Sequence, residues 1–428
     1  MSVAGMDGLR TDQAPPIAIW AGFYLLAPLA IAASGWLVWT GGDVLAASRW
    51  VPRTMAATHV GTLGFLGAVM LGSLYQMIPV VAGAPVPWVR LAHGVQAALA
   101  VGAVALVHGL ATGRPASLAL APQVLGVAFI GFVGPVAVAL ARAPTRSTTV
   151  HGMRLAVLGL IAVVALGATL ALARTGRMRV CGDWIGLVSA HVALGGVVWI
   201  GGLVTAVSWQ VVPMFYLTPP LPRWSQWLTL AVIAGGLVAV IAVVIAGGPR
   251  RHVVMAIAPA VVAIWLLHPL VTARALHRRR RRRVDPSVRF WWAALALAPV
   301  ALALAVATEL GDDPRWPVAM GWVAIWGWAG LIVHGMLSRI VPFLIWFHRF
   351  APLVGRVEVP SMRALLPERR LTVALALHVA AVLAGLTTPL GGGALAARAT
   401  AVLLVATAVV LGANLIHTLR QRPAPPPP

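Results

Sequence analysis

The sequence predicts an all-α integral membrane protein with about twelve transmembrane helices. Hydrophobic residues make up 60% of the 428-residue chain and charged residues only 10%, and the mean hydropathy is +0.91. Soluble globular chains are far more polar than this. Because about 20 apolar residues cross a hydrocarbon layer as a helix, each sufficiently long apolar run predicts one span.

Twelve such runs follow one another along the chain, and no loop between them exceeds about 25 residues, roughly one span in length. The sixth and tenth are longer than a span requires, which predicts tilt or extension beyond the bilayer. Glycine and proline within the runs are compatible with membrane helices. The expected helices cover residues 17–40, 54–81, 91–112, 118–141, 151–174, 184–217, 223–246, 252–276, 288–309, 316–346, 370–390 and 395–419.

The arginine distribution predicts the orientation of these helices. All 32 residues counted as Lys+Arg are arginine, and the net charge is +22. The N-terminus, the even-numbered loops and the C-terminus carry most of them, including the run from Arg278 to Arg283. The positive-inside rule therefore places both termini in the cytoplasm of a multi-pass protein in a bacterial inner membrane. Such a run also suits anionic lipid headgroups, and a nucleic-acid role is disfavoured.

The ends of the chain and its cysteine carry little chemistry. Residues 1–16 form a polar segment expected in the cytoplasm, residues 17–419 form the membrane domain, and residues 420–428 form a Pro-rich tail expected to be disordered. The single cysteine, Cys181, lacks the spacing of a disulfide, a zinc ribbon or a c-type heme motif. We expect it to be structural.

Acidic residues exclude several functional classes. All ten Asp and Glu lie at termini, in loops or at helix ends. Proton pumps and many secondary transporters need a carboxylate in mid-membrane, so these activities are disfavoured. The chain also lacks a P-loop, an HExxH motif and a Ser/His/Asp arrangement, which argues against ATPases and hydrolases.

A weak internal repeat links three of the expected helices. In the second helix His59 precedes "YQMIP" with Pro79 at +20, and in the sixth His191 precedes "WQVVP" with Pro213 at +22. The tenth helix contains "RIVP", with Met320 22 residues before Pro342. A spacing of four helices between copies suggests three pseudo-symmetric four-helix units.

Twelve helices with histidines in the second and sixth resemble the heme–copper oxidase superfamily, and most closely the nitric-oxide reductase large subunit and C-family oxidases. The chain also resembles the NnrS heme- and copper-containing membrane proteins. By this resemblance His59 matches a low-spin heme ligand and His191 a copper ligand. The family's tenth-helix H-x-H falls on "MGW", so Met320 and Trp322 replace it, and the paired histidines of the seventh helix are missing. A complete heme–copper centre cannot then form in the usual way.

The candidate site residues are His59, Met320, His191 and His334, with His59 and His191 as candidate metal ligands. In straight helices the first three lie within about one turn of the same depth, and His with Met is a plausible axial pair for heme. His334 could contribute to a second polar site or contact heme propionates. Packing remains an alternative for each, because membrane histidines also hydrogen-bond neighbouring helices and methionine is an ordinary core residue.

The resulting hypothesis is a heme-binding protein, of unspecified heme type, for electron transfer or handling of a diatomic gas (NO or O2). Its enzymatic status as an oxidoreductase is open. A cytochrome c or another electron-donor protein is the expected partner, besides the lipid bilayer. Copper is expected to be absent or substoichiometric, because His191 lacks the further ligands that a copper ion takes. A heme or copper transporter or chaperone, and a cofactor-free assembly subunit, are the alternatives.

Overall fold

The computed structural model describes residues 13–180, 182–280 and 285–423, and within these ranges the chain is helical with no β-strand. Eleven of the described helical segments are long and apolar enough to span a membrane. The last of them, 53 residues long, reverses near Gly391, whose φ of 105° is not helical. Over the described residues the chain therefore folds as a multi-span all-α membrane protein, and division of the last segment at Gly391 gives twelve crossings, as the apolar runs predict.

The twelve crossings form three units of four, and the second crossing of each unit contains a π-helical segment. Unit 1 consists of α1 (Ile17–Gly41), α2 (Pro52–His59) with η3 (Val60–Gly67) and α3 (Ala68–Met77), α4 (Leu91–Thr112) and α5 (Pro115–Arg142). Unit 2 consists of α6 (Thr148–Arg174), α7 (Trp184–Ala193) with η5 (Leu194–Gly201) and α8 (Gly202–Tyr216), α9 (Arg223–Ile245), and α10 (Arg250–Val262) with η6 (Ala263–Leu267) and α11 (His268–His277). Unit 3 consists of α12 (Pro286–Leu310), α13 (Trp316–Trp322) with η7 (Val323–Gly330) and α14 (Leu331–Arg349), α15 (Glu368–Thr387), and α16 (Gly393–Arg420).

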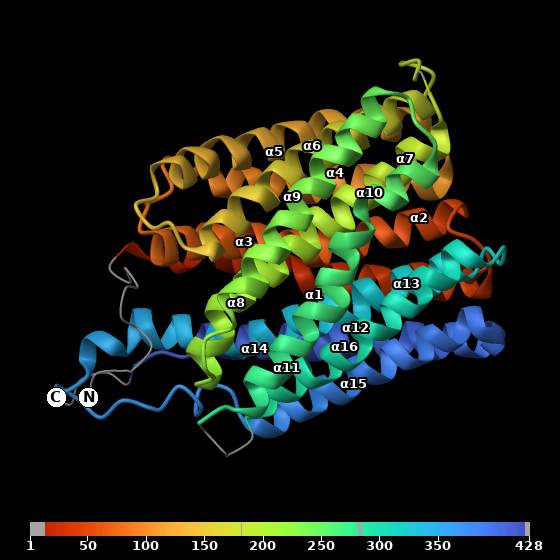
Figure 1. The fold of residues 1–428 in the computed structure, drawn as a ribbon. Coiled ribbons are helices and arrows are strands. Elements are labelled where there is room, and N and C mark those ends of the chain that lie inside the picture. The colour runs from red at the N-terminus through yellow and green to blue at the C-terminus, as the bar shows by residue number, and fades with distance from the viewer. Residues whose placement is uncertain (1–12, 181, 281–284, 424–428) are drawn as a thin grey trace.

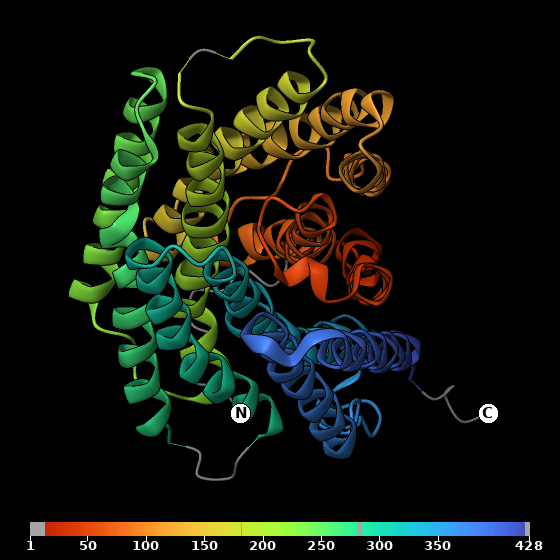
Figure 2. The same ribbon diagram turned by 90° about the vertical axis from the view of Figure 1, so that its right-hand side faces the viewer.

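The three units close into a ring. Within each unit the last two crossings pack together, as α4 with α5, α9 with α10 and α15 with α16. Between units, α5 contacts α6, α11 contacts α12, and α16 returns to α1. Figure 2 shows the units as successive colours around the domain, from red-orange through yellow-green to teal and blue. The three pseudo-symmetric units suggested by the repeat are therefore present in the fold.

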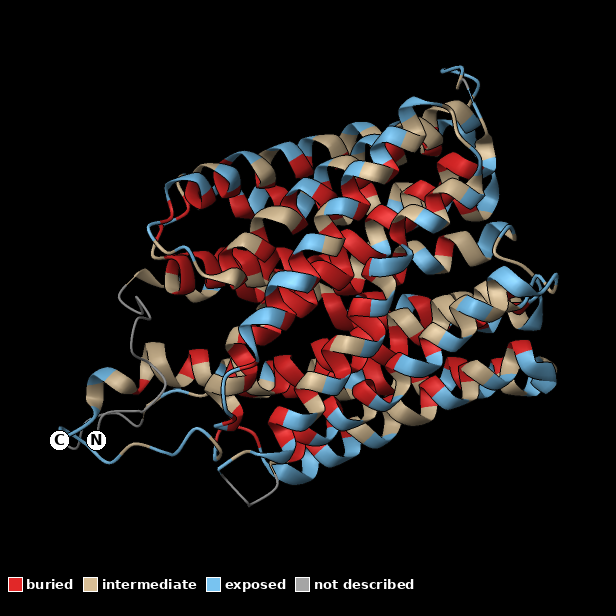
Figure 3. Ribbon diagram, viewed as in Figure 1, coloured by how far each residue is buried: buried red, intermediate tan, exposed pale blue. Residues whose placement is uncertain are grey.

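The second crossing of each unit lies in the interior. We call these three the core helices: Pro52–Ala82, Trp184–Tyr216 and Trp316–Arg349. In the most apolar stretch of each, 83%, 72% and 72% of the residues are buried, whereas the share is 33–56% in the other crossings. Buried residues accordingly gather along the centre of the bundle in Figure 3. Apolar side chains such as Val104, Ile130 and Val238 are exposed on the outer helices. In a membrane protein this surface faces lipid tails, which are as apolar as the side chains.

The three core helices can be aligned with one another without gaps when their prolines Pro79, Pro213 and Pro342 are superimposed. We call this alignment the shared register. The three eight-residue π segments η3, η5 and η7 each begin 19 residues before a proline, at Val60 for Pro79, Leu194 for Pro213 and Val323 for Pro342. In each of these three segments the sixth residue is aromatic and the eighth is glycine. The shared π-helical geometry gives the repeat a structural basis.

Steric crowding explains why the last residue of η3, η5 and η7 is glycine. A Cβ atom on Gly67 would lie 2.8 Å from the Thr62 carbonyl oxygen, and one on Gly330 would lie 2.7 Å from the Ile325 oxygen. For Gly201 the oxygen, that of Gly196, is 3.2 Å away. In each case the crowding carbonyl is five residues earlier, the spacing that a π-helix brings together. Glycine at this position therefore permits the wide turn.

The two ends of the membrane domain lie on the same side. The segment η2 (Gly42–Ala46), which follows α1, contacts both α16 and the segment η9 (Thr388–Gly392) that precedes it. The helices α1 and α16 are therefore antiparallel neighbours, and their labels lie close together in Figure 1. An even number of crossings requires this arrangement. Cys181, most of the N-terminal segment 1–16 and most of the tail 420–428 lie outside the described residues, as does part of the arginine run.

Candidate cofactor site

The structure brings His59 and His191 together from two core helices. Their ring centroids are 6.1 Å apart and the ring planes differ by 23°. His59 is the last residue of α2 and directly precedes η3, whereas His191 lies three residues before η5. In the shared register the two histidines are thus offset by two positions and are not strict equivalents. The two rings therefore lie close together, and their common depth in a membrane stays a prediction.

The hydrogen bond of His59 fixes its tautomer. Its Nδ1 atom is 2.7 Å from the Met55 carbonyl oxygen. A carbonyl only accepts, so Nδ1 donates, and in the neutral ring Nε2 carries the free lone pair. Metal-bound histidines commonly use this arrangement, in which the second nitrogen donates to a carbonyl and orients the ring. His59 therefore has the tautomer of an Nε2 ligand.

His191 is held against a glycine and has a free nitrogen. A Cβ atom on Gly167 of α6 would lie 2.8 Å from the His191 Cε1 atom, so a larger residue there would displace the ring. The Nδ1 atom of His191 is buried and has no hydrogen-bond partner in the described part of the chain. A buried polar nitrogen without a partner is costly in an apolar interior. A ligand at this nitrogen would remove that cost.

Aromatic rings from unit 3 pack next to this site. The Trp326 ring of η7 stacks on Phe65 of η3, with centroids 5.7 Å apart and planes 18° apart. A Cβ atom on Gly61, two residues after His59, would lie 3.4 Å from the Trp326 ring. Trp322 packs on Trp326 and donates its Nε1 hydrogen to the Val382 carbonyl, 2.9 Å away. These contacts give the α2–η3 junction a rigid aromatic neighbour.

Met320 occupies the position of unit 3 that corresponds to His191. It is partly buried in α13 and packs against the apolar core. The ring that lies 6.1 Å from His59, between centroids, belongs to His191. Pairing of Met320 with His59 as an axial ligand stays a prediction.

His334 is paired with a histidine of the eleventh crossing. The Nδ1 atoms of His334 and His378 are 2.9 Å apart, and His378 Nε2 is 3.1 Å from the Trp326 carbonyl oxygen. Because that carbonyl takes the His378 Nε2 hydrogen, the His334 Nδ1–H must donate to His378 Nδ1. Both side chains are fully buried, and His334 Nε2 has no partner among the described residues.

The presence of a buried histidine at position 378 also has a structural explanation. A wide π turn disturbs the regular pairing of backbone groups, and Trp326 lies inside η7. The His378 side chain supplies a donor to its carbonyl. The pair thus ties α14 and α15 to the π segment.

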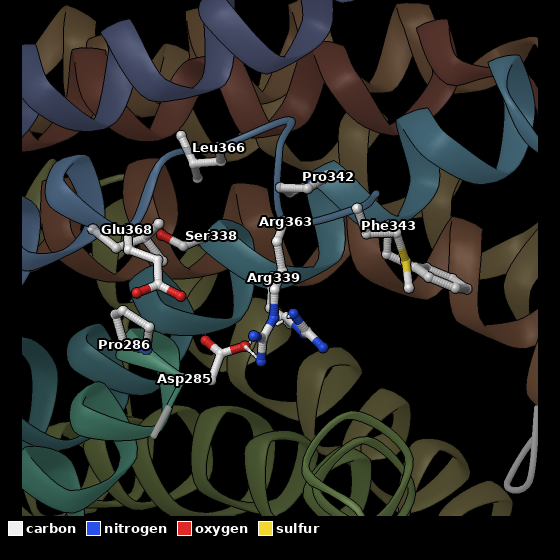
Figure 4. Close-up of a pocket in the computed structure, with 11 residues that line it drawn as sticks. Asp285, Pro286, Ser338, Arg339, Pro342, Phe343, Arg363, Leu366 and Glu368 are labelled. Atoms are coloured by element: carbon white, nitrogen blue, oxygen red, sulfur yellow. Dashed lines mark hydrogen bonds and ion pairs between the residues drawn. The ribbon is translucent and has the colours of Figure 1, made fainter. Parts of the chain in front are cut away.

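A cluster of charged residues lies at the end of unit 3 where α12 begins and α14 ends, on the side of the membrane domain where α1 begins and α16 ends. Arg339 NH1 is 3.0 Å from Asp285 Oδ2, and Arg363 NH2 is 3.9 Å from the same oxygen. Figure 4 shows both guanidinium groups directed at Asp285, with Glu368 across a small cavity of about 30 Å³. Arg339 is therefore paired with an acid within the fold.

The pKa of Asp285 reflects these contacts. Burial alone would raise the pKa of this carboxyl group, but Arg339, the hydrogen bonds from Ser287 and the more distant Arg363 outweigh that effect. The pKa is therefore held below its ordinary value of 3.8. Asp285 also accepts a hydrogen bond from the Ser287 backbone N–H and so caps the N-terminus of α12.

Among the residues that the structure describes, candidate metal ligands do not form groups of three or more. Within residues 13–180, 182–280 and 285–423, no three His, Cys, Asp or Glu side chains lie close enough to hold one metal ion together. No protein-family model matches the chain, and no curated protein matches it. The histidine geometry is consequently the main guide to function.

Two further buried histidines, His268 and His378, have partners on neighbouring helices. His378 pairs with His334, and His268 of α11 lies 2.7 Å from the Ser208 hydroxyl of α8. Their sequence signal is position alone, since each lies well inside an apolar run. A polar side chain at such a position predicts a partner on a neighbouring helix. The identity of that partner depends on the packing of the helices.

Proposed function

We propose that the protein binds a heme between His59 and His191 and transfers electrons in the membrane. The observation that carries the proposal is the spacing of the two rings. A metal–imidazole bond is about 2.0–2.1 Å and a ring centroid lies about 1.2 Å behind its nitrogen, so imidazoles on opposite sides of one metal have centroids about 6.3 Å apart. The observed separation of 6.1 Å is close to this value.

Two histidines suit a heme better than a bare ion. A copper or zinc ion bound only by protein takes three or four ligands, whereas a porphyrin supplies four nitrogens and leaves two axial positions. The described residues offer the two rings and no larger group around them. Copper at this site therefore remains outside the proposal.

Two histidines that held the iron of a heme would favour electron transfer over gas binding at that iron. With His59 and His191 both bound, no open position would remain for a diatomic ligand. A heme in this state would exchange electrons with a partner, and a cytochrome c or another electron-donor protein fits that role. The ring of three four-helix units supports the resemblance to heme–copper oxidases, with a reduced set of ligands.

The arginine distribution gives the site an orientation. If both termini are cytoplasmic, α2 begins at the outer face of a bacterial inner membrane, and His59 lies eight residues into the second crossing. The heme would then lie within the outer half of the bilayer. A donor on the outer side of the membrane could reach it.

An absorption spectrum of the purified protein tests the proposal. We expect one heme per chain with a strong Soret band and sharp α and β bands after reduction, typical of six-coordinate low-spin iron. A colourless protein that gains metal only on loading would favour the transporter or chaperone alternative. A protein that binds neither heme nor metal would favour the assembly subunit.

A further inference from the structure

A cavity of about 70 Å³ lies where the three core helices meet. Each core helix lines it with residues from the same five positions of the shared register. The lining residues are Val69, Met70, Ser73, Leu74 and Met77 of α3; Leu203, Val204, Val207, Ser208 and Val211 of α8; and Ile332, Val333, Met336, Leu337 and Ile340 of α14, together with Trp291 of α12. We call this space the axial cavity.

Matching positions on three helices place the axial cavity on the pseudo-threefold axis of the domain. It begins about one π segment beyond His59, since Val69 lies two residues after η3 ends. The His59 and His191 rings do not line it. The cavity is therefore a feature separate from the proposed heme site.

Polar atoms at the cavity wall are already engaged. The Ser73 hydroxyl is 3.0 Å from the Tyr24 hydroxyl, and the Ser208 hydroxyl lies 2.6 Å from the Thr205 carbonyl and 2.7 Å from His268 Nε2. Trp291 Nε1 donates to the Met336 sulfur over 3.3 Å. The lining includes no charged residue.

Water is poorly suited to such a space. A buried water needs two to four polar partners, and an apolar cavity without them stays dry. Dry cavities of about 150 Å³ take up benzene or xenon. At about half that volume, the axial cavity has room for a molecule of only a few heavy atoms.

We propose that the axial cavity is a binding site for one small apolar molecule of the size of a diatomic gas, such as dioxygen or nitric oxide. The three core helices supply dispersion contacts to the space between them, and the polarisable side chains of Met70 and Met77 belong to this lining. This inference concerns a site away from the histidines and does not rest on heme binding. It gives the protein a second property, retention of a gas at the centre of the membrane domain.

Xenon is a suitable probe because it is apolar and scatters X-rays anomalously. Crystals of the full-length protein pressurised with xenon should show one anomalous peak in the axial cavity. In Val333→Phe the larger ring should fill the space and abolish the peak. Val238→Phe, at a side chain 67% exposed on α9, makes the same substitution on the outer surface and should leave the peak unchanged.

A second variant keeps the test decisive if Val333→Phe does not fold. Leu337→Ala enlarges the same cavity and should raise xenon occupancy at equal pressure. Ordered water in the axial cavity, a wild-type crystal without xenon there, or a peak that persists in a folded Val333→Phe would overturn the proposal. His59→Ala should retain the xenon peak, which separates failure of this inference from failure of the heme proposal.

Discussion

Two histidine pairs connect neighbouring helices of this protein, and their geometries differ. In the pair His334–His378 the two Nδ1 atoms are 2.9 Å apart and bond to each other. In the pair His59–His191 the ring centroids are 6.1 Å apart, and His59 uses its own helix, at Met55, as hydrogen-bond partner. Histidine therefore has two different roles in this protein.

The two pairs differ in how many of their ring nitrogens already have a hydrogen-bond partner. In the first pair, the partner histidine and the Trp326 carbonyl use three of the four nitrogens. In the second pair, the His59 Nδ1 bond leaves Nε2 available, and the His191 Nδ1 atom has no partner within the described ranges. A direct hydrogen bond stabilises packing, whereas two rings with available nitrogens at a metal-sized separation suit a ligand.

Replacement of His59 should produce the largest effect. We expect His59→Ala to lose the low-spin heme spectrum while the protein still inserts and expresses, because the substitution removes an axial ligand and no interhelical hydrogen bond. Heme content per chain and the reduced absorption spectrum measure this. His108→Ala, at an exposed histidine of α4 that contacts Ser117, is the matched control and should keep full heme content. Normal heme and spin state in His59→Ala would reduce this histidine to a packing role.

The next prediction distinguishes the two candidate partners of His59. His191→Ala should leave iron with one protein ligand and shift it to high spin, whereas Met320→Ala should preserve the low-spin spectrum. Electron paramagnetic resonance of the oxidised protein reports the spin state directly. The reverse pattern would assign the second axial position to Met320, as the His–Met alternative requires.

Substitutions in the pair His334–His378 should lower the stability of the fold and leave the heme spectrum unchanged. His378→Leu removes the acceptor of His334 Nδ1–H and the donor to the Trp326 carbonyl, and unsatisfied buried groups of this kind cost about 1–3 kcal/mol. Thermal unfolding in detergent should therefore shift downward with heme spin state intact. The double variant with His334→Leu should cost less than the two single variants added together, because the residues form one network. A change of spin state in His378→Leu would connect this pair to the heme.

The smallest expected effect concerns Asp285. Asp285→Asn keeps a side-chain oxygen that can cap α12 but removes the charge that pairs with Arg339 and Arg363. We expect a loss of about 1–2 kcal/mol, less than the ~3–5 kcal/mol for breaking a fully buried pair, because the cluster is only partly buried. Unfolding midpoints of the two proteins at neutral pH measure this difference.

The same variant tests the pH dependence. The pKa of Asp285 is held below 3.8 in the folded protein, so the ion pair stabilises fully above that value. Its contribution is lost as the pH falls through the lower folded pKa. The stability difference between wild type and Asp285→Asn should thus persist from pH 7 to about pH 5 and shrink below pH 4. A difference that stays constant into strong acid would show that the charge is not involved.

The amino-acid sequence by itself determined the crossings and their grouping. Helix bounds agree with the apolar runs to within a few residues at most ends, because hydrocarbon admits only segments whose backbone groups are internally bonded. The prolines Pro79, Pro213 and Pro342 marked three equivalent helices, and their register extends to aromatic and glycine positions in the π segments. His59 and His191 were also identifiable, as isolated polar residues at similar depth.

Tertiary structure alone decided which side chains meet. In the shared register His191 corresponds to Met320, yet its ring lies beside His59 of another unit. His334 and His378 are 44 residues apart, and Arg339 and Asp285 are 54 apart, with no local spacing that relates either pair. Hydropathy is a property of each segment, whereas the rotation of one helix against another depends on side-chain packing between segments. The axial cavity has the same origin, since it exists only where three separately encoded helices fail to fill the space between them.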